Sequence, residues 1–114
     1  MSRDDATLLD ILRAARLVME FKGKLAKKAF LRDIKTQSAI LHQLLVIGEA
    51  VKRLSANFRA RYPDIPWTRF AGMRDKLIHT YDAVDLDEVW KTVTQEIPPL
   101  MSFLEPLVAR KELK

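Results

Sequence analysis

The sequence predicts a small all-α protein, an up-down bundle built from four helical segments. Apolar residues recur at helical spacing along most of the chain. The 114 residues include only three glycines and five prolines, which favours long helices over a sheet with many turns. A hydrophobic fraction of 48% and a charged fraction of 31% are typical of a chain that buries a core. We expect one domain, residues 1–114.

The first helix is expected over residues 4–21, where apolar residues recur every three or four positions. Ser2 to Asp5 supply capping oxygens and first-turn acids, which are typical of a helix N-terminus. Gly23 should end this helix. The junction that follows is basic, with Lys22, Lys24, Lys27 and Lys28.

The second helix is expected over residues 31–58 and is the longest. One continuous apolar stripe supports it, made of Leu44, Ile47, Val51, Leu54 and Phe58. Gly48 lies inside this segment, where glycine costs about 1 kcal/mol relative to alanine. A glycine at this position would allow another helix to approach closely. We expect the helix to end near Asn57.

Two prolines within residues 62–66 exclude a regular helix, so residues 59–66 should form a loop. A shorter helix is expected over residues 67–79, with Pro66 just before its first turn. The last helix should cover residues 84–109, with Asp85 as its N-cap and Asp87 and Glu88 in its first turn. Pro98 and Pro99 should kink or split it, because each lacks a backbone donor.

Composition excludes several classes of site. The chain has no cysteine, which excludes disulfides and thiolate zinc sites, and only two histidines, which excludes a multi-histidine metal site within one chain. No apolar run is long enough to span a bilayer, and the acidic N-terminus is unlike a signal peptide, so we expect a cytoplasmic protein. The net charge of +5 suits a polyanionic partner such as RNA or DNA, although it is also an ordinary solubility charge.

The candidate chemistry lies in residues 74–81. His79 has the side chain that most often transfers protons near neutral pH, and Asp75, four residues earlier on the same helical face, could orient its ring. Arg74 is permanently charged and offers a planar fork of donors suited to phosphate. Tyr81 follows two residues after His79.

The spacing of these residues allows other interpretations. Arg74 and His79 lie about 140° apart around an ideal helix, so they converge only if the helix ends near His79, if the arginine reaches round, or if a second copy contributes. An Arg-x4-His spacing by itself is more often part of a surface salt bridge. We expect His42 to be partly buried or at an interface. Glu49 is either exposed at the edge of its stripe or paired with a basic group such as Arg53.

Several ordered motifs resemble the HepT-like branch of the HEPN superfamily. They are Ile47-Gly48-Glu49-Ala50-Val51-Lys52-Arg53-Leu54, Ile65-Pro66-Trp67, Gly72-Met73-Arg74-Asp75-Lys76-Leu77-Ile78-His79-Thr80-Tyr81, Val84-Asp85 and Val89-Trp90. The similarity runs from the first helix through Pro98. It implies a HEPN bundle of four or five helices and a homodimer with its active site near the dimer axis.

The resemblance also implies a function. It implies a metal-independent endoribonuclease without cofactors, with Arg74 and His79 as the catalytic pair and Asp75 as a supporting polar residue. Such proteins are toxins of HEPN/MNT (type VII) toxin-antitoxin systems, neutralised by an MntA-like nucleotidyltransferase antitoxin that adds AMP to the tyrosine found here at Tyr81. Asp75 stands where many relatives carry asparagine, and could weaken RNA binding or raise the proton affinity of His79.

Two other functions remain open from the sequence. The chain could be a non-catalytic helical dimer that binds and regulates a partner nucleotidyltransferase. It could also be a regulator that accepts AMP without being toxic. Growth arrest on expression would separate the nuclease from both.

Overall fold

Helices make up all the regular structure within residues 2–80 and 83–112, which are the parts of the chain that this computed structural model describes. In chain order they are α1 (Arg3–Lys22), α2 (Lys27–Phe30), α3 (Ile34–Arg53), α4 (Ala56–Arg61), α5 (Trp67–His79), α6 (Leu86–Lys91), the π-helical segment η1 (Thr92–Glu96) and α7 (Ile97–Glu112). The predicted all-α class is confirmed.

α1 begins and ends where the sequence indicates. The Ser2 hydroxyl accepts a hydrogen bond from the Asp5 backbone N–H at 3.1 Å, and the Asp5 carboxylate accepts from the Ser2 N–H at 3.2 Å. This reciprocal pair is a capping box, which satisfies two donors at the helix start. Gly23 ends the helix with a φ of 52°, a conformation that residues with a side chain rarely adopt.

The helix expected over residues 31–58 is wrong as a single element. Asp33 caps α3, and the chain turns extended at Leu54 (φ −65°, ψ 142°). Ser55 then caps α4, and its N–H and hydroxyl also donate to the Asp4 carboxylate at the start of α1, at 2.9 and 2.7 Å. This contact between distant parts of the chain favours a new cap at Ser55 over continued helix. The apolar stripe nevertheless points inward throughout, because all five of its residues are buried.

The predicted loop over residues 59–66 is too long, since α4 continues to Arg61. The predicted helix over residues 67–79 matches α5 in both bounds. Asp85 caps α6 as expected, accepting from the Glu88 N–H at 3.1 Å.

The interruption expected at Pro98 and Pro99 lies one turn earlier, as the π-helical segment η1. The two prolines fall in the first turn of α7, where the missing donors matter least. In the π-helical turn before them, the Ile97 N–H bonds to the Thr92 carbonyl five residues earlier, so the backbone hydrogen-bonding pattern changes there and not at the prolines.

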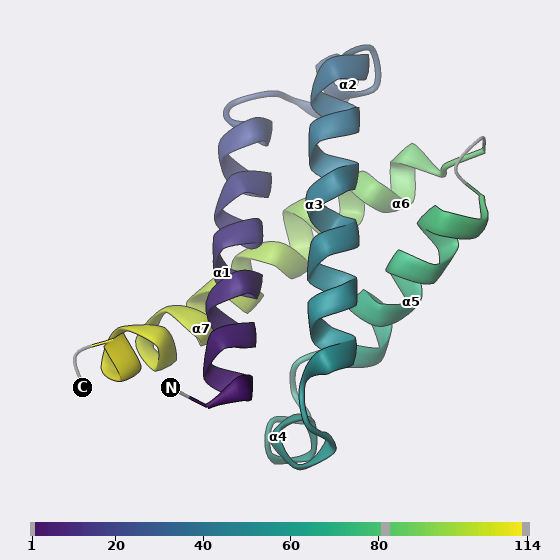
Figure 1. Ribbon diagram of the computed structural model, residues 1–114. Helices are drawn as coiled ribbons and strands as arrows, with labels where there is room; N and C mark the ends of the chain where they lie inside the picture. Colours follow the sequence, from purple (N-terminus) through teal and green to yellow (C-terminus); the bar gives the residue numbers. More distant parts are fainter. Residues whose placement is uncertain (1, 81–82, 113–114) are drawn as a thin grey trace.

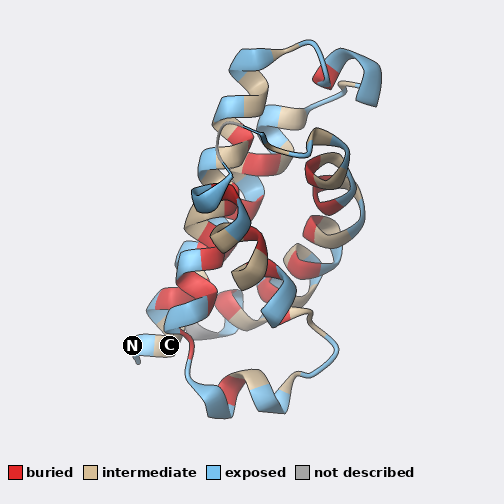
Figure 2. Cartoon of the chain, turned by 90° about the vertical axis from the view of Figure 1, so that its right-hand side faces the viewer, coloured by how far each residue is buried: buried red, intermediate tan, exposed pale blue. Residues whose placement is uncertain are grey.

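The helices enclose one cluster of buried residues. α1 lies alongside α3, α5 packs on α3, and the segment from α6 to α7 crosses the bundle and packs on α1 (Figure 1). Buried residues line the helix faces that look inward, and exposed residues cover the outside (Figure 2). Trp67 is buried, and Trp90 is half-buried with its ring 5.3 Å from that of Phe30. None of the described helices is both long and apolar enough to span a bilayer.

Candidate active site

Gly48 brings α3 and α5 into close contact at the position of Arg74. A Cβ atom built on Gly48 would lie 2.3 Å from the Arg74 Cβ and 2.8 Å from the Phe70 carbonyl oxygen. Both distances are shorter than any real contact, so only glycine fits at this helix crossing. The expected close approach is confirmed, and it places the base of the Arg74 side chain directly against the α3 backbone.

Two carboxylates hold the Arg74 guanidinium. Its Nε lies 3.0 Å from Glu49 Oε2 on α3, and its Nη1 donates to Asp75 Oδ1 at 2.9 Å. The hydrogen bond that Arg74 donates to Asp75 and the charge of Glu49 raise the pKa of Arg74 above its ordinary value. Within the described residues, Nη2 has no hydrogen-bond partner. The side chain is 28% exposed, and Nη2 is its one guanidinium nitrogen that no described residue occupies.

Asp75 is paired with cations and not with His79. Lys52 Nζ lies 2.6 Å from Asp75 Oδ1, and the hydrogen bonds from Lys52 and Arg74 lower the pKa of this carboxyl. Asp75 is therefore a firmly ionised carboxylate that steadies Arg74. The expectation that it orients the His79 ring is not met among the described residues, because Asp75 is instead bound by Lys52 and Arg74, which share its Oδ1.

His79 is the last residue of α5 and is exposed. The Thr80 N–H and hydroxyl both bond to the Lys76 carbonyl, at 2.9 and 2.6 Å, which ends the helix there. No hydrogen bond joins His79 to Arg74 within the described part of the chain. One chain thus brings Arg74, Asp75 and Glu49 together, but leaves His79 apart at the helix end. Tyr81 lies outside the described residues.

Glu49 is both exposed and paired with a basic group, as the sequence allows, but its partner is Arg74 and not Arg53, which lies 3.9 Å from Asp10 on α1. Lys52 is a site residue that the sequence motifs do not single out. Its position one helical turn after Gly48 and Glu49 was the available signal, since it shares the α3 edge that faces α5. His42 is exposed, so the expectation of partial burial is wrong for the single chain.

A shallow hollow of about 310 Å³ lies beside Arg74, between α3 and α5. It is lined by Leu45, Val46, Glu49, Arg53, Arg74 and Ile78. Ile78 is 42% exposed, so the hollow has an apolar rim next to the guanidinium.

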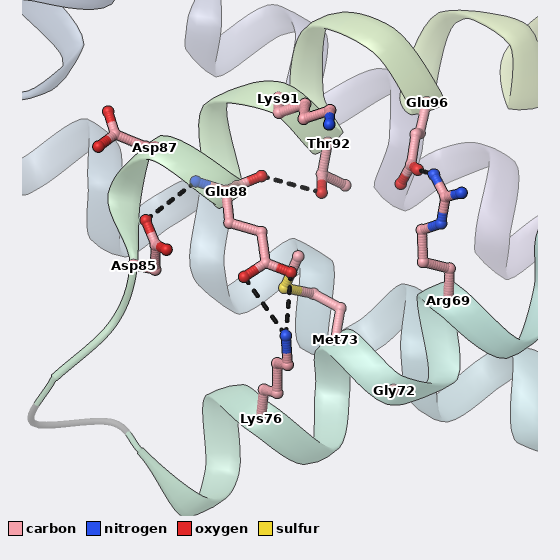
Figure 3. Close-up of a pocket in the computed structure, with 10 residues that line it drawn as sticks. All are labelled: Arg69, Gly72, Met73, Lys76, Asp85, Asp87, Glu88, Lys91, Thr92 and Glu96. Carbon is pink, nitrogen blue, oxygen red and sulfur yellow. Dashed lines mark hydrogen bonds and ion pairs between the residues drawn. The ribbon is translucent and has the colours of Figure 1, made fainter.

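A larger hollow of about 630 Å³ lies between α5 and the α6–η1 segment (Figure 3). Two ion pairs run between these elements: Lys76 with Glu88 at 3.1 Å, and Arg69 with Glu96. Neither Arg74, Asp75 nor His79 lines this hollow. Its charged side chains are largely paired with one another, so we interpret it as a salt-bridged joint between helices. No group of three or more potential metal ligands occurs among the described residues.

The sequence profile described as "Ribonuclease HepT-like" matches residues 11–107. The chain belongs to the ribonuclease HepT-like family. A relative from Thermococcus cleftensis, named as a probable ribonuclease HepT, is 45% identical over 100 residues, covering 88% of this chain and 91% of the relative. A protein of Methanocaldococcus jannaschii named as a candidate RNase is 38% identical over 103 residues, covering 90% and 85% of the two chains.

A third HepT-like relative, from Caldanaerobacter subterraneus subsp. tengcongensis and also named as a candidate RNase, is 34% identical over 102 residues, covering 90% of this chain and 91% of its own. No solved structure matches the chain with statistical significance. The HepT-like match spans both helices that form the Arg74 cluster, α3 and α5, and so confirms the resemblance inferred from the motifs.

Proposed function

We propose that this HepT-like chain is a metal-independent endoribonuclease and the toxin of a HEPN/MNT toxin-antitoxin pair. Arg74 carries the proposal. Its guanidinium is fixed through Nε and Nη1, offers Nη2 beside a hollow, and belongs to a chain whose relatives are named as ribonucleases. A cation held in this way is suited to binding an RNA phosphate.

The RNA supplies its own nucleophile. A base takes the proton of the 2′-hydroxyl, the 2′-oxygen attacks the adjacent phosphorus, and the bond from phosphorus to the 5′-oxygen breaks as an acid protonates the leaving oxygen. The products are a 2′,3′-cyclic phosphate and a 5′-hydroxyl. We assign the proton transfers to His79 and the stabilisation of the charged phosphorane to Arg74.

The separation of His79 from Arg74 within one chain supports a homodimer. Arg74 faces α3, whereas His79 is exposed at the end of α5. The apolar rim of Leu45, Val46 and Ile78 beside Arg74 suits burial against a second copy. In that dimer, two copies of the motif would supply two histidines, one as the base and one as the acid.

The deciding experiment incubates purified protein with total RNA in excess EDTA, beside His79→Ala and Arg74→Lys. We expect the native chain to cleave RNA to cyclic-phosphate ends and both variants to lose at least about 100-fold in rate. Arg16→Ala is the control, because Arg16 is exposed on α1, which carries none of the proposed site residues, and it should cleave normally. Cleavage that requires magnesium, or that survives His79→Ala, would contradict the proposal.

We further propose that the partner is an MntA-like nucleotidyltransferase that silences the nuclease by adding AMP to Tyr81. A bulky anion so close in sequence to His79 would compete with the RNA phosphate. Tyr81→Phe should arrest growth even when the transferase is co-expressed, while the native protein should be silenced and gain the mass of one AMP. Silencing of Tyr81→Phe to the same degree would contradict this assignment.

One observation favours a second candidate, a non-catalytic dimer that binds and regulates the transferase. Two of the three Arg74 guanidinium nitrogens are already occupied by carboxylates, as in a purely structural ion pair. This candidate predicts no growth arrest on expression alone, no RNA cleavage and an unmodified intact mass.

A further inference from the structure

The excess positive charge of this chain is concentrated in one short stretch. Residues 22–35 hold six of the 20 basic residues and one of the 15 acidic residues, which gives this stretch a formal charge of +5. The whole chain has the same net charge, so the other hundred residues balance to zero. We call the six basic side chains the basic pole: Lys22, Lys24, Lys27, Lys28, Arg32 and Lys35.

The basic pole forms one end of the bundle. Its residues come from the end of α1, from α2 and its flanking turns, and from the first turn of α3, which lie together at the top of Figure 1. All of these side chains are exposed except Lys22, which is partly buried with its ammonium 5.3 Å from the centre of the Trp90 ring.

The backbone that carries the pole is anchored. Phe30 is fully buried in the core with its ring tilted by 36° against that of Trp90, and its carbonyl accepts a hydrogen bond from Gln37 Nε2 at 2.9 Å. α2 therefore presents its lysines from a fixed position, so that binding a ligand orders little of the backbone.

Most of this charge is not neutralised by the protein. Lys27 pairs with Asp87 at 2.9 Å, and the Asp33 carboxylate is used by the N–H and hydroxyl of Thr36. Within the described residues, Lys24, Lys28, Arg32 and Lys35 form no salt bridge, although the charge of Lys35 helps to lower the pKa of Asp33. Several exposed cations in so small an area form a site for a polyanion.

The pole contacts the helix that follows the proposed nuclease motif in the chain. The Lys27–Asp87 pair joins it to α6, which begins seven residues after His79. The longest dimension of the molecule is 43 Å, which corresponds to about 13 nucleotides at 3.4 Å each. One RNA strand of ordinary length can therefore contact both places.

We propose that the basic pole is a second RNA-binding surface, which holds the phosphates of the strand that flanks the cleaved bond. The choice of RNA as the ligand rests on the proposed function, whereas the location of the site rests on the distribution of charge. Lysine and arginine contacts to phosphates carry no base information. The pole should thus add affinity for long RNA of any sequence and leave the chemical step to Arg74 and His79.

The test compares two triple variants that each remove three positive charges. Lys24→Gln/Lys28→Gln/Arg32→Gln weakens the pole, whereas Arg13→Gln/Arg16→Gln/Arg110→Gln removes exposed charges from α1 and α7 as a matched control. Binding of a single-stranded RNA of about 20 nucleotides is measured by fluorescence anisotropy at several salt concentrations, in a His79→Ala background that prevents cleavage. The pole variant should bind about 10- to 100-fold more weakly, with a salt slope reduced by about 2.

Cleavage assays with His79 restored separate this inference from the proposed function. If both are right, the pole variant cleaves a trinucleotide as fast as the native chain and cleaves long RNA more slowly. If the native chain cleaves nothing but the pole variant still loses RNA affinity, the proposed function fails and the binding surface stands. Equal RNA affinity for the two triple variants overturns the inference. A pole that binds the transferase and not RNA would give this result.

Discussion

Arg74 is defined by what surrounds it more than by its motif. Glu49 and Asp75 bind two of its nitrogens, and Lys52 keeps Asp75 ionised. These three residues together fix the orientation of the guanidinium and so the position of Nη2. A guanidinium held in this way loses little side-chain freedom when it binds phosphate, whereas a free surface arginine must first be ordered. Glu49 is thus a positioning residue, since it acts only through Arg74.

We expect Glu49→Gln to lower kcat for RNA cleavage about tenfold with little change in KM, because a small misplacement of Arg74 matters most in the transition state. Glu49→Asp should recover part of the loss. The unfolding midpoint should hardly change, since partly exposed ion pairs contribute little stability. Glu105→Gln, exposed on α7, is the control. Faster cleavage by Glu49→Gln would mean that Glu49 competes with the phosphate.

At the scale of elements, the close crossing of α3 and α5 requires a glycine at position 48. The apolar stripes predicted α5 in both bounds, but they could not show that α3 stops at Arg53. That boundary depends on the Asp4 carboxylate, which bonds to Ser55 from 51 positions away. Helical periodicity is a local pattern, so a cap that depends on a distant partner does not appear in it.

Gly48→Ala should lower the free energy of unfolding by about 2 kcal/mol. Its Cβ would meet the Arg74 Cβ and the Phe70 carbonyl, neither of which can move without shifting α5, and overpacking of this kind outweighs the gain in helix propensity of about 1 kcal/mol. Gly72→Ala on α5 is the matched control, because its new Cβ has no neighbour within 4 Å, and it should stabilise the protein. Urea denaturation measures both, and equal effects would contradict this account of the crossing.

At the scale of the whole molecule, the proposed active site is incomplete in one chain. Arg74 and His79 are close in sequence, but α5 points them in different directions, and among the described residues Arg74 has carboxylate partners whereas His79 has none. The hollow beside Arg74 and its apolar rim lie on the surface that a second copy would cover.

We therefore expect Ile78→Glu to give a folded monomer that does not cleave RNA. Ile78 is 42% exposed, so a charge there should be tolerated by the single chain but not inside an apolar dimer interface. Circular dichroism checks the fold, and sedimentation equilibrium measures the mass. Phe21→Glu is the control, since Phe21 is a comparably exposed apolar residue on α1. A dimer that survives Ile78→Glu would place the interface elsewhere.

The sequence by itself determined the helical class, the inward stripes, the cap residues Ser2 and Asp85, and the motif that identifies the family, because each depends on residues within a few turns of one another. Only the tertiary structure decided that Glu49 and Lys52 belong to the site, that Asp75 faces cations instead of His79, and that α3 ends at Arg53. Those features arise from pairing between helices. Such pairing depends on the angle and distance at which the helices cross, which no spacing within a single helix specifies.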